Sequence, residues 1–309
     1  MVPVTEGGQH DHGEGAVNTS GASSVLVGLL RSMRPRQWAK NVLVIAAPLA
    51  AGSLFEVDVL AGTAVAFVAF CLTASAVYLL NDVRDVDEDR RHPTKRHRPI
   101  AAGTVPPQTA LGLSALLFVV GIGIGFVWAT PLGATLLVYA AAQVGYALWL
   151  KNQPVLDLAI VASGFLLRAV AGGTASDIPL SQWFLLVASF GSLFMVAGKR
   201  YSEIQTLGSG SRTRRTLEEY SESYLRFVWG LAAGITIVSY SLWAFEVREG
   251  PHLPWEAFSI APFVLALLRY AADVDRGLAG APEDIVLKDW VLQLLGGAWL
   301  VLVALGVFR

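Results

Sequence analysis

The sequence predicts an all-α membrane protein that crosses the bilayer nine times. Its composition is 54% hydrophobic and only 15% charged, and its mean hydropathy of +0.54 lies far from the values of soluble domains. Several segments, among them residues 61–80 and 178–198, contain no charged side chain. Each is long enough to cross about 30 Å of hydrocarbon as a helix. These observations together define the fold class.

Each crossing is placed by its apolar run and by the polar residues that bound it. The first follows a basic, aromatic stretch around Trp38, and the second ends where the first polar cluster begins. Residues 99–150 lack any acidic or basic side chain, which suits two helices broken near Pro131 and Gly133. The sixth ends before a second polar cluster. The nine predicted crossings are residues 38–56, 60–81, 107–128, 132–150, 154–173, 180–198, 226–246, 257–272 and 289–308.

The basic residues lie almost entirely on one side of the predicted membrane. Arg248 and Arg309 fall on the opposite side and Arg168 falls in the interior of a crossing, while all other Lys and Arg residues lie on one side or close to the end of a crossing on that side. By the positive-inside rule that side is cytoplasmic, so the amino terminus is inside and the carboxyl terminus outside. We expect a multi-pass protein of the cytoplasmic (inner) membrane.

The amino-terminal residues differ from the rest of the chain. Residues 1–24 are rich in Gly, Ser and Thr, so residues 1–30 are predicted to be a disordered cytoplasmic tail and residues 31–309 a single transmembrane domain. A charged n-region and a cleavage site are lacking before the first apolar segment, so no cleaved signal peptide is expected. Cys71 is the only cysteine, which excludes intrachain disulfides and cysteine-ligated metal clusters.

The first polar cluster, residues 81–103, follows the second crossing. If the helix continues through it, Asp82, Asp85 and Asp89 stand at i, i+3 and i+7 and share one face. Carboxylates this close repel one another unless a cation lies among them, and hard oxygen ligands suit Mg²⁺. Asn81 adds a neutral oxygen or a donor. The pattern favours a magnesium site.

A simpler interpretation of this cluster also stands. Arg84, Arg90 and Arg91 are interleaved with the acids, and a solvated acidic helix end of this kind is a common surface pattern. Lys95 and Arg98 follow directly, however, and place cations where a polyphosphate would need them. Acidic and basic groups together favour a binding site for a metal ion and a polyphosphate over a solvated helix end.

The second polar cluster follows the sixth crossing and begins at Lys199. Lys199 and Glu203 are spaced for a simple i, i+4 ion pair on a helix. Arg200 and Tyr201 lie between them, at the point where a bundle cavity would open to the cytosol. Both clusters follow even-numbered crossings, so they face the same side of the membrane.

Two charges are predicted within the fifth crossing. Asp157 and Arg168 are separated by about three helical turns and project from the same face, toward the interior of the bundle. An intramembrane arginine is a functional candidate, although it could also make a structural pair. Before the first crossing, Arg34 and Lys40 belong to a basic stretch typical of an inner-leaflet anchor or of a headgroup site.

The pattern Asn-Asp-x-x-Asp-x-x-x-Asp at residues 81–89 resembles the first signature of UbiA-type intramembrane prenyltransferases, at the cytoplasmic end of the second of nine helices. In that superfamily the signature binds Mg²⁺ and a prenyl diphosphate, and a second aspartate-rich signature follows the sixth helix. Residues 198–203 read GKRYSE at that second place. The whole of residues 30–308 resembles a branch of membrane phosphoribosyltransferases, notably in RPRQWAKNVLVIAAPLA, FGSLFMVAGKRYSE, YLRFVWGL and ADVDRGLAGAPEDI.

This resemblance implies a nine-helix UbiA-type catalytic bundle with Mg²⁺ as cofactor. The implied reaction transfers 5-phosphoribosyl from phosphoribosyl pyrophosphate to decaprenyl phosphate or another polyprenyl phosphate. Pyrophosphate is released, and the product decaprenylphosphoryl-5-phosphoribose serves the arabinan of cell-wall arabinogalactan. The implied surroundings are the lipid bilayer and a homo-oligomer such as a trimer, with no nucleic acid.

The resemblance also implies roles for individual residues. Asp82, Asp85 and Asp89 hold the metal against the diphosphate, helped by Asn81. The basic side chains then divide between the two substrates. Lys95 and Arg98 neutralise the leaving group, Lys199 and Arg200 meet the 5-phosphate, Tyr201 and Glu203 contact ribose hydroxyls or a second cation, and Arg34, Lys40, Lys151 or Arg168 orient the lipid phosphate.

Two other functions stay open on these patterns. A UbiA-type prenyltransferase would move a prenyl group from a prenyl diphosphate to an aromatic acceptor, and a transporter or lipid-binding scaffold would do neither reaction. The cations at residues 199 and 200 favour the phosphoribosyl donor over the prenyl donor, because carboxylates there would repel the 5-phosphate. A transport path would need polar residues through to the far face.

Overall fold

The computed structural model describes residues 19–207, 220–246, 253–276, 285 and 288–308. All regular secondary structure in these ranges is helical, which confirms the predicted class. Eight helical segments are long and apolar enough to cross a membrane. The main helices are α3 (Val57–Arg84), α5 (Pro107–Trp128), α6 (Thr130–Leu148), α7 (Leu156–Ala175), α8 (Gln182–Leu207), α10 (Glu222–Glu246), α12 (Ile260–Asp275) and α14 (Trp290–Val307).

Shorter helices lie between and before these spans. The amino-terminal α1 (Thr19–Ser32) is followed by η1 (Pro35–Ile45) and α2 (Ala46–Ala50), and α11 (Trp255–Phe258) precedes α12. At the polar end of the bundle lie α4 (Val86–Arg91), η2 (Lys95–His97) and η3 (Leu150–Asn152).

The first predicted crossing, residues 38–56, was wrong. Among the described residues this segment forms η1 and α2 instead of one membrane-spanning helix, which leaves eight spans in place of nine. Pro48 has no N–H to donate to the carbonyl of Val44, which breaks the helical pattern. That carbonyl instead points at Gly172, where an added Cβ would overlap its oxygen. Irregular backbone at membrane depth must be enclosed by protein, and η1 lies against α3 and α7.

The segment predicted to be a disordered tail is in part helical. α1 covers residues 19–32, and Leu29 and Met33 pack on a core cluster that includes Leu79 and Ile100. Residues 25–30, which are mostly apolar, were included in the predicted tail because a Gly- and Ser-rich segment directly precedes them. Residues 1–18 lie outside the described residues.

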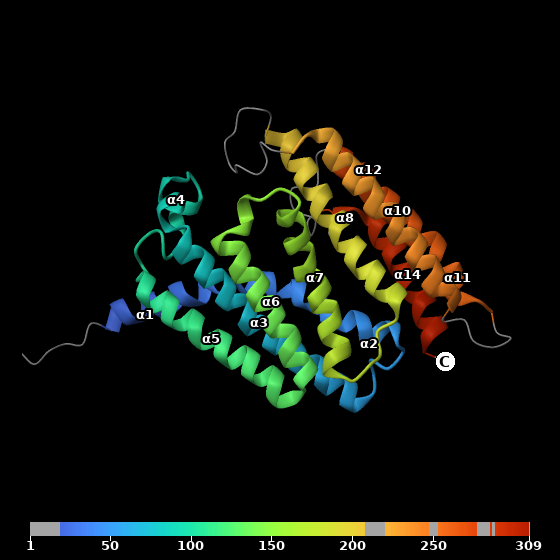
Figure 1. Ribbon diagram of the computed structural model, residues 1–309, viewed down its shortest axis with the longest axis horizontal. Helices are drawn as coiled ribbons and strands as arrows, with labels where there is room; N and C mark the ends of the chain where they lie inside the picture. The colour runs from blue at the N-terminus through green and yellow to red at the C-terminus, as the bar shows by residue number, and fades with distance from the viewer. Residues whose placement is uncertain (1–18, 208–219, 247–252, 277–284, 286–287, 309) are drawn as a thin grey trace, which may run out of the picture.

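The spans form two groups that meet at α7 and α8 (Figure 1). α3, α5, α6 and α7 make the blue-to-green half, and α8, α10, α12 and α14 make the yellow-to-red half. The carboxyl end of α3 with α4, the turn between α6 and α7, and the carboxyl end of α8 lie at one end of the bundle (Figure 1). Both polar clusters therefore reach the same end, as predicted.

Candidate active site

Two aspartates converge on one arginine at the end of α3. Asp82 and Asp89 are 3% and 2% exposed. The Arg98 Nη1 donates to Asp82 Oδ1 at 3.2 Å and to Asp89 Oδ2 at 2.7 Å, and the Arg34 Nη2 donates to the same Asp82 oxygen at 2.5 Å. Burial of two carboxylates is costly unless cations and hydrogen bonds compensate their charge. The two guanidinium groups supply that compensation.

Arg34 is held in an uncommon backbone conformation beside this pair. Its φ of 54° and ψ of 62° lie in the left-handed region, which non-glycine residues seldom adopt. Its guanidinium also lies 4.9 Å from the centroid of the Tyr78 ring. Backbone strain of this kind persists where surrounding contacts over-determine it, often at functional sites.

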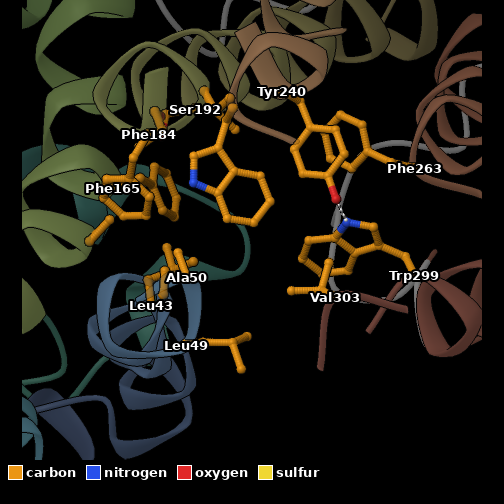
Figure 2. Close-up of a pocket in the computed structure, with 15 residues that line it drawn as sticks. Leu43, Leu49, Ala50, Phe165, Phe184, Ser192, Tyr240, Phe263, Trp299 and Val303 are labelled. Atoms are coloured by element: carbon orange, nitrogen blue, oxygen red, sulfur yellow. Dashed lines mark hydrogen bonds between the residues drawn. The ribbon is translucent and has the colours of Figure 1, made fainter. Parts of the chain in front are cut away.

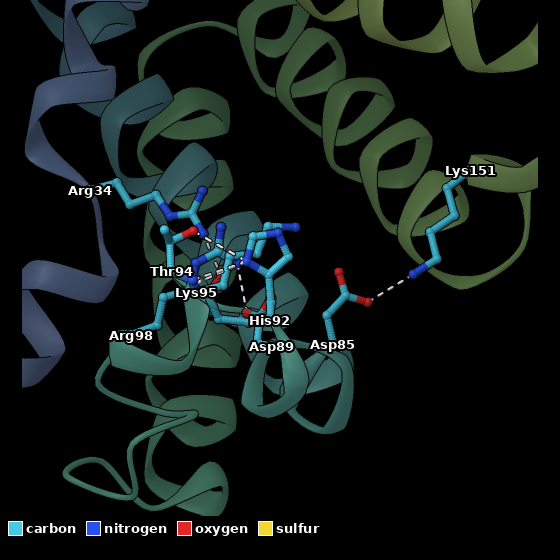
Figure 3. A network of polar contacts seen from close by, with 9 residues as sticks. Arg34, Asp85, Asp89, His92, Thr94, Lys95, Arg98 and Lys151 are labelled. Atoms are coloured by element: carbon cyan, nitrogen blue, oxygen red, sulfur yellow. Dashed lines mark hydrogen bonds and ion pairs between the residues drawn. The ribbon is translucent and has the colours of Figure 1, made fainter. Parts of the chain in front are cut away.

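The third aspartate does not join the other two. α3 ends at Arg84, and Asp85 (φ −95°, ψ 13°) separates it from α4, so the predicted continuous helix through residue 89 is wrong. Because of this break, α4 turns Asp89 back toward Asp82. Asp85 instead accepts a hydrogen bond from the Lys151 Nζ at 2.8 Å, away from the Arg34 and Arg98 side chains (Figure 3).

The pair formed by Asp82 and Asp89 fits a divalent metal ion. Among the described residues no group of three or more His, Cys, Asp or Glu side chains has metal-binding geometry. Mg²⁺, however, is commonly bound through one or two carboxylates together with substrate phosphates and water. One guanidinium already lies within hydrogen-bond distance of both carboxylates, so the pair accommodates a cation between its oxygens.

The loop that carries Lys95 is ordered by a histidine that the sequence patterns did not single out. The backbone N–H groups of Thr94 and Lys95 donate to His92 Nδ1 at 3.2 and 3.3 Å (Figure 3). Lys95 is thus the first residue of η2, the short helix that ends directly before Arg98. A signal was present in the sequence, since His92 begins the HPTK turn, but its role depends on the folded loop.

Arg200 of the second cluster is engaged in a buried pair. Its Nε and Nη2 donate to Asp157 at 3.1 and 3.2 Å, and its Nη1 donates to Glu203 at 3.0 Å. Tyr146 also donates to Asp157, at 2.6 Å. Asp157 therefore pairs with Arg200 of α8. The sequence placed Asp157 on the same helix face as Arg168, about three turns away and out of direct contact. A contact between Arg200 and a substrate phosphate would require these bonds to be rearranged.

Tyr201 faces the other way from Arg200. It is fully buried, donates to Asp275 at 3.1 Å, accepts from Arg226 at 2.6 Å and stacks on Trp229. It therefore joins α8 to α10 and α12 instead of facing the carboxylate pair. Lys199, two residues before Tyr201, is half-buried. Of the four residues that the sequence makes candidates for the donor, Tyr201 points away from the carboxylate pair, and Arg200 is held by Asp157 and Glu203.

Arg168 lies deep in the bundle. Its Nε donates to Asn41 at 2.7 Å, its Nη1 to the Gly164 carbonyl and its Nη2 to the Tyr139 hydroxyl. Asn41 in turn donates to Cys71 at 3.2 Å, and Cys71 precedes Asp82 on α3 by roughly 16 Å of helix. Arg168 thus holds η1 inside the bundle and is too deep to meet a diphosphate at Asp82.

An apolar cavity of about 220 Å³ lies deeper between the two halves of the bundle (Figure 2). Aromatic and aliphatic residues form its wall, and Trp299 Nε1 donates to the Tyr240 hydroxyl at 2.6 Å (Figure 2). This bond ties α10 to α14. The lining residues also include Leu43, Phe165, Phe184, Ala188, Ser192, Phe263 and Val303. The cavity suits a hydrocarbon chain.

A helical membrane bundle with buried acidic and basic residues at one end and an apolar cavity below defines a class of intramembrane enzyme. The chain belongs to the UbiA prenyltransferase family, whose profile matches residues 42–283. A solved structure of a UbiA homologue from Archaeoglobus fulgidus bound to DMAPP and Mg²⁺ has the same fold, with a TM-score of 0.67 and 16% identity over 91% of this chain and 98% of that chain.

The similarity to individual relatives is much closer. The decaprenyl-phosphate phosphoribosyltransferase of Mycolicibacterium smegmatis is 53% identical over 301 residues, which cover 93% of this chain and 95% of the relative. The decaprenyl-phosphate phosphoribosyltransferase of Mycobacterium tuberculosis is 51% identical over 94% of this chain and 98% of its own length. The family expected from residues 81–89 is therefore confirmed.

Proposed function

We propose that this protein transfers the 5-phosphoribosyl group of phosphoribosyl pyrophosphate to decaprenyl phosphate and releases pyrophosphate. One observation carries the proposal: two relatives with this named activity are more than 50% identical over nearly the full length of both chains. The product is decaprenylphosphoryl-5-phosphoribose, a precursor of cell-wall arabinan. The reaction takes place at the cytoplasmic face of the inner membrane, the side that carries the basic residues.

The donor diphosphate binds where Asp82 and Asp89 converge. These carboxylates, with Asn81 and with Asp85 after a change of side-chain direction, hold Mg²⁺. The bound ion supplies charge neutralisation for the pyrophosphate leaving group. Arg98, which lies between the two carboxylates, is placed to exchange carboxylate oxygens for phosphate oxygens. Lys95 adds a second positive charge on the same loop.

The acceptor enters from the membrane. Its isoprenoid chain occupies the apolar cavity, because hydrocarbon of this length leaves a nonpolar environment only at high cost. Its phosphate lies nearer the cytoplasmic end, where Arg34, Lys40 and Lys151 are candidates to orient it. Lys199 and Glu203 remain candidates for the 5-phosphate and for the ribose hydroxyls.

The reaction itself asks little acid–base chemistry of the protein. The bond between C1 and the pyrophosphate oxygen breaks, and its electron pair leaves with pyrophosphate. An oxygen of the polyprenyl phosphate forms the new bond to C1 from the opposite face, which inverts that carbon. Because the acceptor phosphate is already anionic near neutral pH, no general base is required. The side chains therefore act by positioning and by electrostatic stabilisation.

The decisive experiment compares two donor and acceptor pairs on the purified full-length protein with Mg²⁺. One pair is phosphoribosyl pyrophosphate with decaprenyl phosphate, and the other is geranylgeranyl diphosphate with an aromatic acid. We expect pyrophosphate release from the first pair alone. Turnover of only the second pair would make the protein an aromatic prenyltransferase and would overturn the proposal. Cross-linking in native membranes would test the expected trimer separately.

A further inference from the structure

The turn between α6 and α7 has an unusual backbone. Val155, directly before α7, has φ 68° and ψ −50°. A β-branched residue with positive φ is a genuine outlier, because its Cβ crowds the backbone. The Val155 side chain is 55% exposed, so packing of that side chain does not account for the conformation. Contacts elsewhere in the turn must hold it.

Two sets of buried contacts hold this turn. At its base, Tyr146 of α6 donates to Asp157 of α7 at 2.6 Å, and Arg200 of α8 donates to both carboxylate oxygens of Asp157. At its top, the N–H of Val155 donates to the Tyr220 hydroxyl at 2.7 Å. Burial raises the pKa of Tyr220, so its hydroxyl stays neutral near pH 7. Three helices thus fix one short turn.

The same turn reaches across to the carboxylate site. Its Lys151 donates to Asp85 Oδ1 at 2.8 Å (Figure 3), and Arg84 of α3 donates to the carbonyl of Leu148 at 3.3 Å. Lys151 is the basic residue of the turn, and Asp85 is the one signature aspartate that faces away from Arg98. The turn therefore connects the second polar cluster, through Asp157, to the first.

We propose that Asp157 is a positioning residue for the phosphoribosyl transfer. Together with Tyr146 and Arg200 it forms a clamp that holds the α6–α7 turn, so that the Lys151 ammonium, beside Asp85, is presented to the phosphate of the polyprenyl acceptor. The inference rests on the proposed function for the identity of that phosphate. The position of Lys151 itself does not depend on it.

The Asp157–Arg200 ion pair of the clamp fixes the geometry of the turn in addition to joining two helices. A buried ion pair often stabilises a fold no better than apolar residues of similar volume, and in several proteins such a pair instead selects one arrangement of the chain. Here the geometry specified is that of a strained turn with a cation at its tip. Backbone strain kept in place by a buried polar network is typical of pre-organised sites. A misplacement of about 1 Å at such a site can cost about a hundredfold in rate.

A double-mutant cycle tests whether the clamp acts through Lys151. Tyr146→Phe removes one hydroxyl, and Lys151→Ala removes the cation. We expect Tyr146→Phe to lower kcat/KM for decaprenyl phosphate at least about tenfold, and the double variant to be no worse than Lys151→Ala alone. Losses that multiply would show two independent roles and would overturn the proposal. Tyr224→Phe, which removes a hydroxyl outside the clamp and keeps the ring that stacks on Tyr220, is the matched control.

A second measurement tests the position of Lys151 without any turnover. Trace acetylation followed by mass spectrometry gives the reactivity of Lys151 relative to the exposed Lys288 in the same molecule. We expect the ratio to rise severalfold in Tyr146→Phe and in Asp157→Asn, which keeps the side-chain shape and removes the charge that Arg200 meets. An unchanged reactivity ratio in both variants would contradict the proposal that the clamp positions Lys151. If the wild-type protein did not use phosphoribosyl pyrophosphate, the proposed function would be wrong. The acetylation ratios would still show whether the clamp positions Lys151.

Discussion

Asp82 and Asp89 are seven residues apart in sequence, and both accept hydrogen bonds from the same nitrogen, Arg98 Nη1. This arrangement follows from the break at Asp85 between α3 and α4. A straight helix would instead have placed Asp85 on the same face as Asp82 and Asp89.

Asp89→Asn should reduce activity far more than Asp87→Asn. Asp89 is 2% exposed and faces Asp82, whereas the Asp87 side chain is 80% exposed and makes a 3.4 Å pair with Arg90. We expect Asp89→Asn to lower pyrophosphate release about a hundredfold, since a charge at the leaving group is lost, and Asp87→Asn to stay within about twofold of wild type. Equal losses in the two variants would show that the buried pair has no special role.

Arg98→Ala should lower stability and make it depend on magnesium. Without this guanidinium the buried carboxylates repel each other, which is expected to cost about 3 kcal/mol. Added Mg²⁺ should raise the Tm of the variant more than that of wild type, as measured by thermal unfolding in detergent. Arg90→Ala removes a weak exposed pair and should cost less than about 1 kcal/mol. A Tm of Arg98→Ala that ignores Mg²⁺ would contradict metal binding at this pair.

Ala188→Phe should affect the lipid substrate selectively. Ala188 lines the cavity of about 220 Å³, and a phenyl ring there would occupy space that we assign to the isoprenoid chain. We expect the KM for decaprenyl phosphate to rise at least about tenfold, as several buried CH₂ contacts are lost, while the KM for phosphoribosyl pyrophosphate stays unchanged. Val119→Phe on the exposed face of α5 is the matched control. A rise in both KM values would indicate general distortion.

Gly172→Ala should prevent η1 from docking. Its Cβ would overlap the carbonyl oxygen of Val44, a clash that only a backbone shift can relieve. We expect little folded protein by size-exclusion chromatography. Gly230→Ala, where no atom lies within 4 Å of the new Cβ, should be neutral or gain up to about 1 kcal/mol from helix propensity. Normal yields of Gly172→Ala would refute this close approach.

Asp289 should contribute a pH-dependent part of the stability. Its carboxylate accepts from Arg269 Nε at 2.6 Å and from the N–H groups of Val291 and Leu292, and these bonds, that of Arg269 above all, lower its pKa. A lowered folded-state pKa stabilises the fold above the unfolded value, about 3.9, and this stabilisation disappears as the pH falls through the folded pKa. The Tm difference between wild type and Asp289→Asn should therefore shrink below about pH 4. A Tm difference that stays constant with pH would contradict a stabilising role for the ionised Asp289 carboxylate.

Much of the site could be predicted from the residues alone. The spacing of Asp82, Asp85 and Asp89 after an apolar run, with Arg98 close behind, is enough to predict a site at the end of α3. The direction in which Asp85 points could not be predicted, because it depends on a helix break that only the packing of α4 and the turn carrying Lys151 stabilises. The pairing of Asp157 with Arg200 was likewise hidden, since 43 residues separate them.

The sequence by itself determined the class of protein, because several charge-free runs of about twenty residues are each long enough to cross a bilayer as a helix. It also determined which polar residues reach the same end of the bundle. The tertiary structure alone decided how those residues pair, that residues 35–50 form η1 and α2 instead of one long helix, and that Arg168 serves the interior of the bundle. Such choices depend on contacts between distant helices, where a buried charge must find a partner that local periodicity does not reveal.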